Sequence, residues 1–266
     1  MDDVNARPPT ERKPLSALPP LPPPPPPVEP AEFPPGFWPA VDYMLHHPDR
    51  ILASLRADRD LGRLSGIFFR IGLITCALYG AVMGATNLLQ GSELDLVHKF
   101  MQIGVTALKV PVLFLLTCAI VLPPIYVSNA FVGSKLSFRQ MLAVLLSSLA
   151  VTTTVLASMA TVALFFSLTS QSYDFLKLLH VLFFVYAGLS GLGYQRRCLR
   201  ELMPPGTSSG GLWVLWLVLY MFVGTQLAWV LRPFVGDPGT HFQVFRARTG
   251  NFYESVLHST GKLLDE

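Results

Sequence analysis

Six histidines and three cysteines are the residues of this chain most able to carry chemistry. The histidines stand singly except for His46 and His47, and none forms an H-E-x-x-H motif or pairs with a carboxylate at ligand spacing. Cys76, Cys118 and Cys198 are far apart and form no C-x-x-C pair. No G-x-S-x-G setting and no glycine-rich phosphate loop is present. The sequence therefore predicts no catalytic, cofactor-binding or metal site, and a protein that is not an enzyme.

A charged residue inside an apolar run is a stronger chemical signal. Lys109 lies near the start of "LKVPVLFLLTCAIVLPPIYV" (108–127). Either its ammonium reaches outward to lipid headgroups, or it forms an ion pair with Asp174, which we expect near the same membrane boundary. Arg70 stands about one turn inside another apolar run, and the same outward reach applies to it.

Hydroxyl and amide side chains also fall inside the apolar runs. Ser147, Thr154, Ser158 and Thr161 share one face at helical spacing. They could line a polar path, bond across to a neighbouring helix, or bond to carbonyls of their own helix, which is the usual outcome. Gln226 is a candidate for an interhelical hydrogen bond.

Small residues and prolines in these runs concern helix packing. Gly80 and Gly84 form a G-x-x-x-G motif that favours close contact between helices without specifying a dimer. Pro111 is expected to bend its helix, and Pro123 with Pro124 to end or kink it. Neighbouring membrane helices can satisfy the carbonyls that these prolines free.

The composition shows what surrounds these residues. The chain has 266 residues, of which 51% are hydrophobic and 14% charged, whereas about 25% are charged in an average protein. The apolar residues fall in runs of about 20, enough to cross about 30 Å of hydrocarbon. We predict an all-α integral membrane helical bundle over 65–231. Its five transmembrane helices are expected at about 66–89, 103–126, 141–168, 175–194 and 212–231.

Three segments flank the bundle. Residues 1–36 contain "PPLPPPPPPVEP" and are predicted to be a disordered, proline-rich tail, either bait for an aromatic-lined groove or a stiff spacer. Residues 37–64 predict an amphipathic helix starting near Pro48, in the headgroup layer or in the cytosol. Residues 232–266 predict a short amphipathic helix, on the outer membrane surface or on the bundle.

Charges and tryptophans predict the orientation. Nine arginines and lysines belong to one side: Arg50, Arg56, Arg59, Arg63, Lys135, Arg139, Arg196, Arg197 and Arg200. This excess places the N terminus in the cytoplasm and, after five spans, the C terminus outside. Trp213 and Trp216 at one end of the last span and Trp229 at the other are typical of aromatic belts. No basic stripe for nucleic acid is present.

Three stretches carry a resemblance to a known family. They are "LKVPVLFLLTCAIVLPPIYVSNAFVGSKLSF", "FLKLLHVLFFVYAGLSG" and "FVGTQLAWVLRPFVGDPG…FRARTGNFYESVL". The chain resembles Yip1-domain membrane proteins, and more closely uncharacterised bacterial multi-span proteins of that type. The resemblance implies a helical bundle in the bacterial inner membrane whose partners organise membranes, and it supplies no catalytic residue.

Two functions are therefore expected. The first is a non-enzymatic membrane scaffold or adaptor, whose cytoplasmic tail docks a protein partner. The alternative is a small transporter or channel subunit that uses the hydroxyl face of the third span and Lys109.

Overall fold

The structure, a computed structural model, describes residues 29, 31–89, 96–133, 136–170, 172–203, 210–232 and 252–265. Within these residues every regular element is a helix, which confirms the all-α prediction. The helices are α1 (Phe37–His46), α2 (Pro48–Arg56), α3 (Leu61–Leu89), α4 (Leu96–Phe131), α5 (Phe138–Ser158), α6 (Ala160–Thr169), α7 (Tyr173–Leu202), α8 (Gly210–Leu231) and α9 (Phe252–Asp265). Disorder was predicted for residues 1–36, and most of this tail, including residues 1–28, lies outside the described part of the chain.

Five stretches of the described chain are long and apolar enough to cross a membrane, as predicted. They are Leu61–Thr86, Phe100–Phe131, Phe138–Thr169, Tyr173–Leu202 and Gly211–Leu231. At 1.5 Å per residue the last is about 32 Å long, close to the hydrocarbon thickness, and the second is about 48 Å. The protein is therefore a multi-pass membrane protein, and some of its helices extend beyond the hydrocarbon layer.

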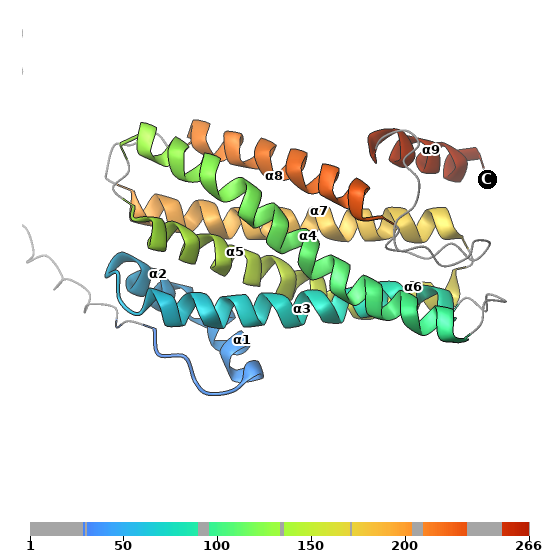
Figure 1. The fold of residues 1–266 in the computed structure, drawn as a ribbon, viewed down its shortest axis with the longest axis horizontal. Helices are drawn as coiled ribbons and strands as arrows, with labels where there is room; N and C mark the ends of the chain where they lie inside the picture. Colours follow the sequence, from blue (N-terminus) through green and yellow to red (C-terminus); the bar gives the residue numbers. More distant parts are fainter. Residues whose placement is uncertain are drawn as a thin grey trace, which may run out of the picture.

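The spans lie side by side, and α4 runs obliquely across them (Figure 1). It packs on α3 near its own start and on α8 near its own end. The starts of α3 and α5 and the ends of α4 and α7 all lie at the end of the bundle that carries α2, which we call the α2 end. The opposite end, where α9 lies on α7 and α8, is called the α9 end.

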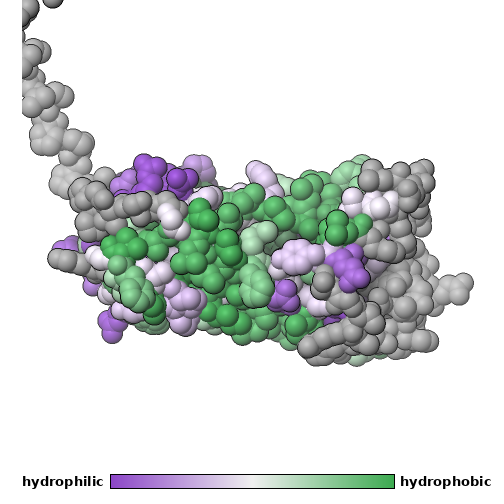
Figure 2. Space-filling model, turned by 90° about the horizontal axis from the view of Figure 1, so that it is seen from above, coloured by the Kyte–Doolittle hydropathy of each residue, from purple (hydrophilic) through white to green (hydrophobic). Residues whose placement is uncertain are grey.

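Hydrophobic residues form a band over the middle of the molecule. In the view from above, this band is flanked by hydrophilic residues toward both ends (Figure 2). Such a band is the surface that a bilayer requires, because hydrocarbon cannot solvate charged or hydrogen-bonding groups.

Local sequence signals explain where several helices begin. Ser137 and Gln140 form a reciprocal capping box at the start of α5. The Ser172 side chain accepts from the Phe175 N–H at the start of α7. Pro48 occupies the first turn of α2 with Asp49 beside it, as predicted.

Two helix boundaries differ from the prediction. The region 48–64 is divided, because a turn with Asp58 and Asp60 in left-handed conformations (φ 53° and 51°) separates α2 from α3. The fourth span was predicted to end at Tyr194, but α7 continues to Leu202 and buries Cys198 and Leu199. The mean hydropathy falls after Tyr194 because arginines on the exposed face of α7 alternate with these buried residues.

The prolines of α4 do not end the helix. Pro111, Pro123 and Pro124 all lie inside it, and it continues seven residues beyond the last of them to Phe131. The prediction that Pro123 and Pro124 could end the helix is therefore wrong. The third span does carry a break, at Met159, which separates α5 from α6.

Candidate functional site

The α2 end is built around a docked N-terminal hairpin of α1 and α2. The inward side chains of α2, Ile51 and Leu55, are fully buried in one apolar cluster with residues of α3 and α5. The apolar face of α2 is therefore covered by protein. The prediction that this helix lies in the headgroup layer or is a free cytosolic helix missed that contact, because amphipathicity alone does not identify what covers the apolar face.

The hairpin also fixes the chain that precedes it. The Ala31 N–H donates to Ser54 Oγ at 2.6 Å. Phe33 is 8% exposed and contacts the rings of Tyr43 and Phe68. Ala31 and Phe33, which the sequence placed in the tail, thus pack on the hairpin and on α3. The proline-rich region is joined directly to a segment packed on the bundle.

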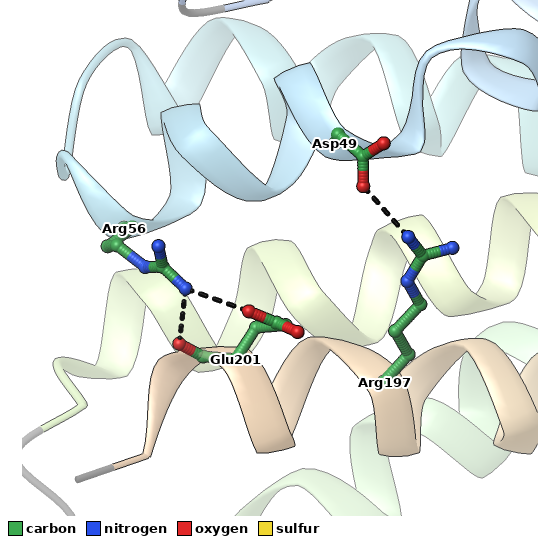
Figure 3. Close-up of polar contacts among 4 residues, drawn as sticks. All are labelled: Asp49, Arg56, Arg197 and Glu201. Atoms are coloured by element: carbon green, nitrogen blue, oxygen red, sulfur yellow. Dashed lines mark hydrogen bonds and ion pairs between the residues drawn. The ribbon is translucent and has the colours of Figure 1, made fainter. Parts of the chain in front are cut away.

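Polar contacts tie the hairpin to α7 (Figure 3) and to α5. Arg56 Nη2 lies 3.0 Å from Glu201 Oε2 and 2.7 Å from the Glu201 carbonyl, and Arg197 Nη2 lies 2.8 Å from Asp49 Oδ1. All four side chains are about half exposed or more, and such pairs contribute about 0.2–1 kcal/mol each. Gln140 Nε2 donates to the Leu55 carbonyl at 3.0 Å. These contacts orient a hairpin whose stability comes from the buried apolar face.

A second candidate site is a file of buried polar pairs inside the bundle, which we call the polar file. Thr75 Oγ1 donates to Thr153 Oγ1 at 2.8 Å. The Tyr79 hydroxyl lies 2.6 Å from His180 Nδ1, and Thr86 Oγ1 lies 3.4 Å from Ser167 Oγ. All six side chains are buried. Because 11 residues of α3 separate Thr75 from Thr86, the file extends about 16 Å along the bundle.

The centre of the polar file is chemically incomplete. His180 Nε2 is buried and has no hydrogen-bond partner among the described residues. An unsatisfied buried polar atom costs about 1–3 kcal/mol. His180 stands alone in the sequence and was not predicted as a site residue, although the spacing of Thr75, Tyr79 and Thr86 on one face of α3 indicates a polar contact there.

Toward the α2 end, polar groups join α5 and α7. Ser148 Oγ donates to the Gly191 carbonyl at 3.1 Å and lies 3.4 Å from Gln195 Oε1. A Cβ added at Gly191 would collide with the Thr152 side chain, so glycine is required for this close approach. Gly191 is thus a point of close contact between α5 and α7.

The predicted hydroxyl face does not line an internal path. Thr154 Oγ1 donates to the Ala150 carbonyl at 2.7 Å, and Ser158 Oγ donates to the Val155 carbonyl at 2.6 Å. Ser158 and Thr161 are exposed. The local bonding expected by default is confirmed for Ser147, Thr154 and Ser158. Ser147 is the buried member of this face, and the hydroxyl of Thr153, which meets another helix, lies on a different face.

The predicted G-x-x-x-G motif is a helix contact, as expected. A Cβ on Gly80 would lie 2.6 Å from the Thr106 carbonyl oxygen, and one on Gly84 would lie 2.8 Å from the Ile103 Cα. These glycines therefore allow α3 and α4 to approach within the same chain. Arg70 is exposed on α3, which leaves its side chain able to extend along the bundle surface.

The structure supports neither predicted role of Lys109, the outward reach to lipid headgroups or the ion pair with Asp174. Lys109 is 6% exposed, so its side chain lies among protein atoms and not in the headgroup layer. Asp174 Oδ1 accepts from Ser259 Oγ of α9 at 2.7 Å. Lys177 Nζ contacts Ser255 Oγ at 2.7 Å and Ser259 Oγ at 2.8 Å. The acidic residue expected for Lys109 instead helps to hold α9, which rests on the bundle as one prediction stated.

The last span differs from prediction at Trp216 and Gln226. Trp216 is fully buried, and its Nε1 donates to Ser128 Oγ at 3.3 Å, so it joins α8 to α4 and is not part of an aromatic belt. Trp229 stacks with Arg232, whose guanidinium carbon lies 3.5 Å from the ring centroid. Gln226 is exposed. The polar contact at its depth is made by its neighbour Thr225 with Tyr253 of α9 (3.3 Å).

No metal-binding group of three histidine, cysteine, aspartate or glutamate side chains occurs among the described residues. Comparison with known proteins found no match to a family model, a curated protein or a solved structure. The function must therefore be argued from the site geometry.

Proposed function

We propose that this protein is a non-enzymatic membrane scaffold or adaptor, in which the bundle is the anchor and the proline-rich region is the docking element. One observation carries the proposal: the chain that follows the prolines is packed on the bundle through the Ala31–Ser54 hydrogen bond and the buried Phe33. A partner held by the prolines would be held at a fixed place on the membrane surface.

The finer parts of the proposal rest on sequence. The basic residues described near the α2 end support a cytoplasmic N terminus. The resemblance to Yip1-domain proteins supports a place in the bacterial inner membrane and a role in membrane organisation. A polyproline II helix is a preformed ligand for aromatic-lined grooves, which supports a protein partner.

The test compares proteins crosslinked in native membranes to three forms of the chain. These are the full-length protein, a form lacking residues 1–28, and a form of equal length in which Pro22–Pro27 are replaced by glycine and serine. Both altered forms keep Ala31 and Phe33, so the hairpin stays docked. We expect the same partner to be lost from both. A set of crosslinked proteins unchanged in either form would contradict the docking role.

The alternative, a small transporter or channel subunit, is favoured by one observation, the polar file. Its six side chains place hydrogen-bonding groups along about 16 Å of an apolar interior. The flux test therefore uses Thr75→Val with Thr153→Val in reconstituted liposomes, with Thr154→Val as the matched control. Substrate-dependent flux that is lost only in the double variant would replace the scaffold proposal.

A further inference from the structure

The span α8 is the least covered of the five. Only 6% of its most apolar window is buried, compared with 33% to 44% in the other four spans. Its main neighbours are α4 and, near its end, α9. Most of its surface is thus available to lipid or to another molecule.

The exposed face of α8 has a regular pattern. Leu215, Val218 and Phe222 are exposed and follow at spacings of three and four residues, and Gln226 follows four residues later. This spacing is that of the seam between two packed helices. This pattern alone would suit a helix face covered by lipid equally well. Gln226 is the residue that distinguishes lipid from a second helix.

Lipid acyl chains cannot hydrogen-bond a glutamine on this face. A primary amide has two N–H donors and an oxygen with two acceptor sites, and no described residue hydrogen-bonds the amide of Gln226. The nearer boundary is marked by the Trp229–Arg232 stack. Side chains of a helix tilt toward its N-terminus, so Gln226 is directed away from that boundary, toward the exposed Phe222.

We infer that α8 is the interface of a homodimer in which Gln226 of one chain hydrogen-bonds Gln226 of a second copy. The amide is complementary to itself, because each can donate an N–H to the other's carbonyl across a two-fold axis. The second copy is the occupant that supplies such a group at the same depth. Leu215, Val218 and Phe222 then pack against their counterparts along the seam.

The test measures the dimer fraction of the full-length protein in liposomes by single-molecule photobleaching over a range of protein-to-lipid ratios. The wild type and Gln226→Asn, which keeps the amide, are expected to dimerise. Gln226→Leu should weaken dimerisation by about 5- to 30-fold, the range given by interhelical hydrogen bonds in model peptides. This variant should fold, because it removes a polar group from a lipid-facing position.

The matched control is Ser158→Leu, which also replaces an exposed polar residue of a span but one whose hydroxyl already bonds its own helix. Its dimer fraction should equal that of the wild type. A wild type that is monomeric at every density, a Gln226→Leu variant that dimerises normally, or an equal loss in Ser158→Leu would each overturn the inference.

Discussion

At the scale of single residues, glycines and paired polar side chains determine how the spans fit together. Gly80 and Gly84 let the backbone of α4 approach α3, and Gly191 does the same for α5 and α7. The polar pairs connect α3 with α5, α6 and α7, in an environment where hydrophobic attraction between helices is absent. Substitutions at these positions should therefore affect the free energy of unfolding more than the small change in side-chain size suggests.

Replacing Gly80 by alanine should destabilise the protein. The new methyl group would lie 2.6 Å from the Thr106 carbonyl oxygen, so the two helix backbones must move apart. We expect a loss of about 1–3 kcal/mol, as for other overpacked contacts. Thermal unfolding in detergent, followed by circular dichroism, would measure it. Gly66→Ala, on the same helix with open space around the added Cβ, should be neutral or slightly stabilising.

Replacing Tyr79 by phenylalanine should also destabilise the protein. The change leaves His180 Nδ1 buried without the hydroxyl that lies 2.6 Å away, at a cost of about 1–3 kcal/mol. Tyr186→Phe is the control, because Tyr186 is 56% exposed. In a double-mutant cycle with His180→Leu, the combined loss should be smaller than the sum of the single losses. Additive losses would show that the two side chains do not interact.

At the scale of elements, the hairpin of α1 and α2 shows the balance between apolar burial and ion pairing. Leu55 and Arg56 are neighbours on α2, but Leu55 is fully buried and Arg56 forms an exposed ion pair with Glu201. Apolar burial gives the larger free energy here, since exposed ion pairs are screened by water and salt.

Leu55→Ala should release the hairpin, whereas Arg56→Ala should not. Truncating a fully buried leucine costs about 2–5 kcal/mol, and losing an exposed ion pair costs about 0.2–1 kcal/mol. Hydrogen exchange of the α2 amides in the reconstituted protein would show faster exchange for Leu55→Ala only. Equal protection in both variants would mean that the buried face does not hold the hairpin.

The sequence predicts elements of this protein better than their contacts. Five apolar runs and the start of α2 at Pro48 could be found because lipid requires long apolar helices and proline suits a first turn. The polar face of the third span could not be assigned correctly, since periodicity identifies a face without identifying its neighbour. Ser158 is exposed, and Thr153, five residues earlier, is buried against Thr75.

Tertiary contacts also override compositional signals. Trp216 has the position of a belt residue, yet a serine on α4 within 3.3 Å gives its indole N–H a partner inside the protein. His180 is isolated in the sequence and meets Tyr79 only because α7 and α3 place the two side chains at the same depth inside the bundle. Such pairs depend on the relative depth of two helices, which a single sequence does not specify.

At the scale of the whole molecule, one end is basic and carries the hairpin, and the other carries α9. The described arginines Arg59, Arg63, Arg139 and Arg200 lie near the α2 end, on or beside α3, α5 and α7. Basic residues near the ends of spans are retained on the cytoplasmic side. The orientation of the molecule in its membrane should therefore follow from these residues.

Cysteine labelling with a membrane-impermeant maleimide would test this orientation. Arg59→Cys, in the turn between α2 and α3, and Thr260→Cys, on α9, both create exposed thiols at opposite ends of the molecule. Thr260 is preferred to Ser259, whose side chain is fully buried. In intact cells, we expect labelling of Thr260→Cys alone, and after membrane disruption labelling of both, because the basic residues predict that only the α9 end faces outward. The unsubstituted protein is the control for Cys76, Cys118 and Cys198, of which the first and last are buried. Labelling of Arg59→Cys in intact cells would show the opposite orientation. The proline-rich region would then lie outside, where a cytoplasmic partner could not reach it.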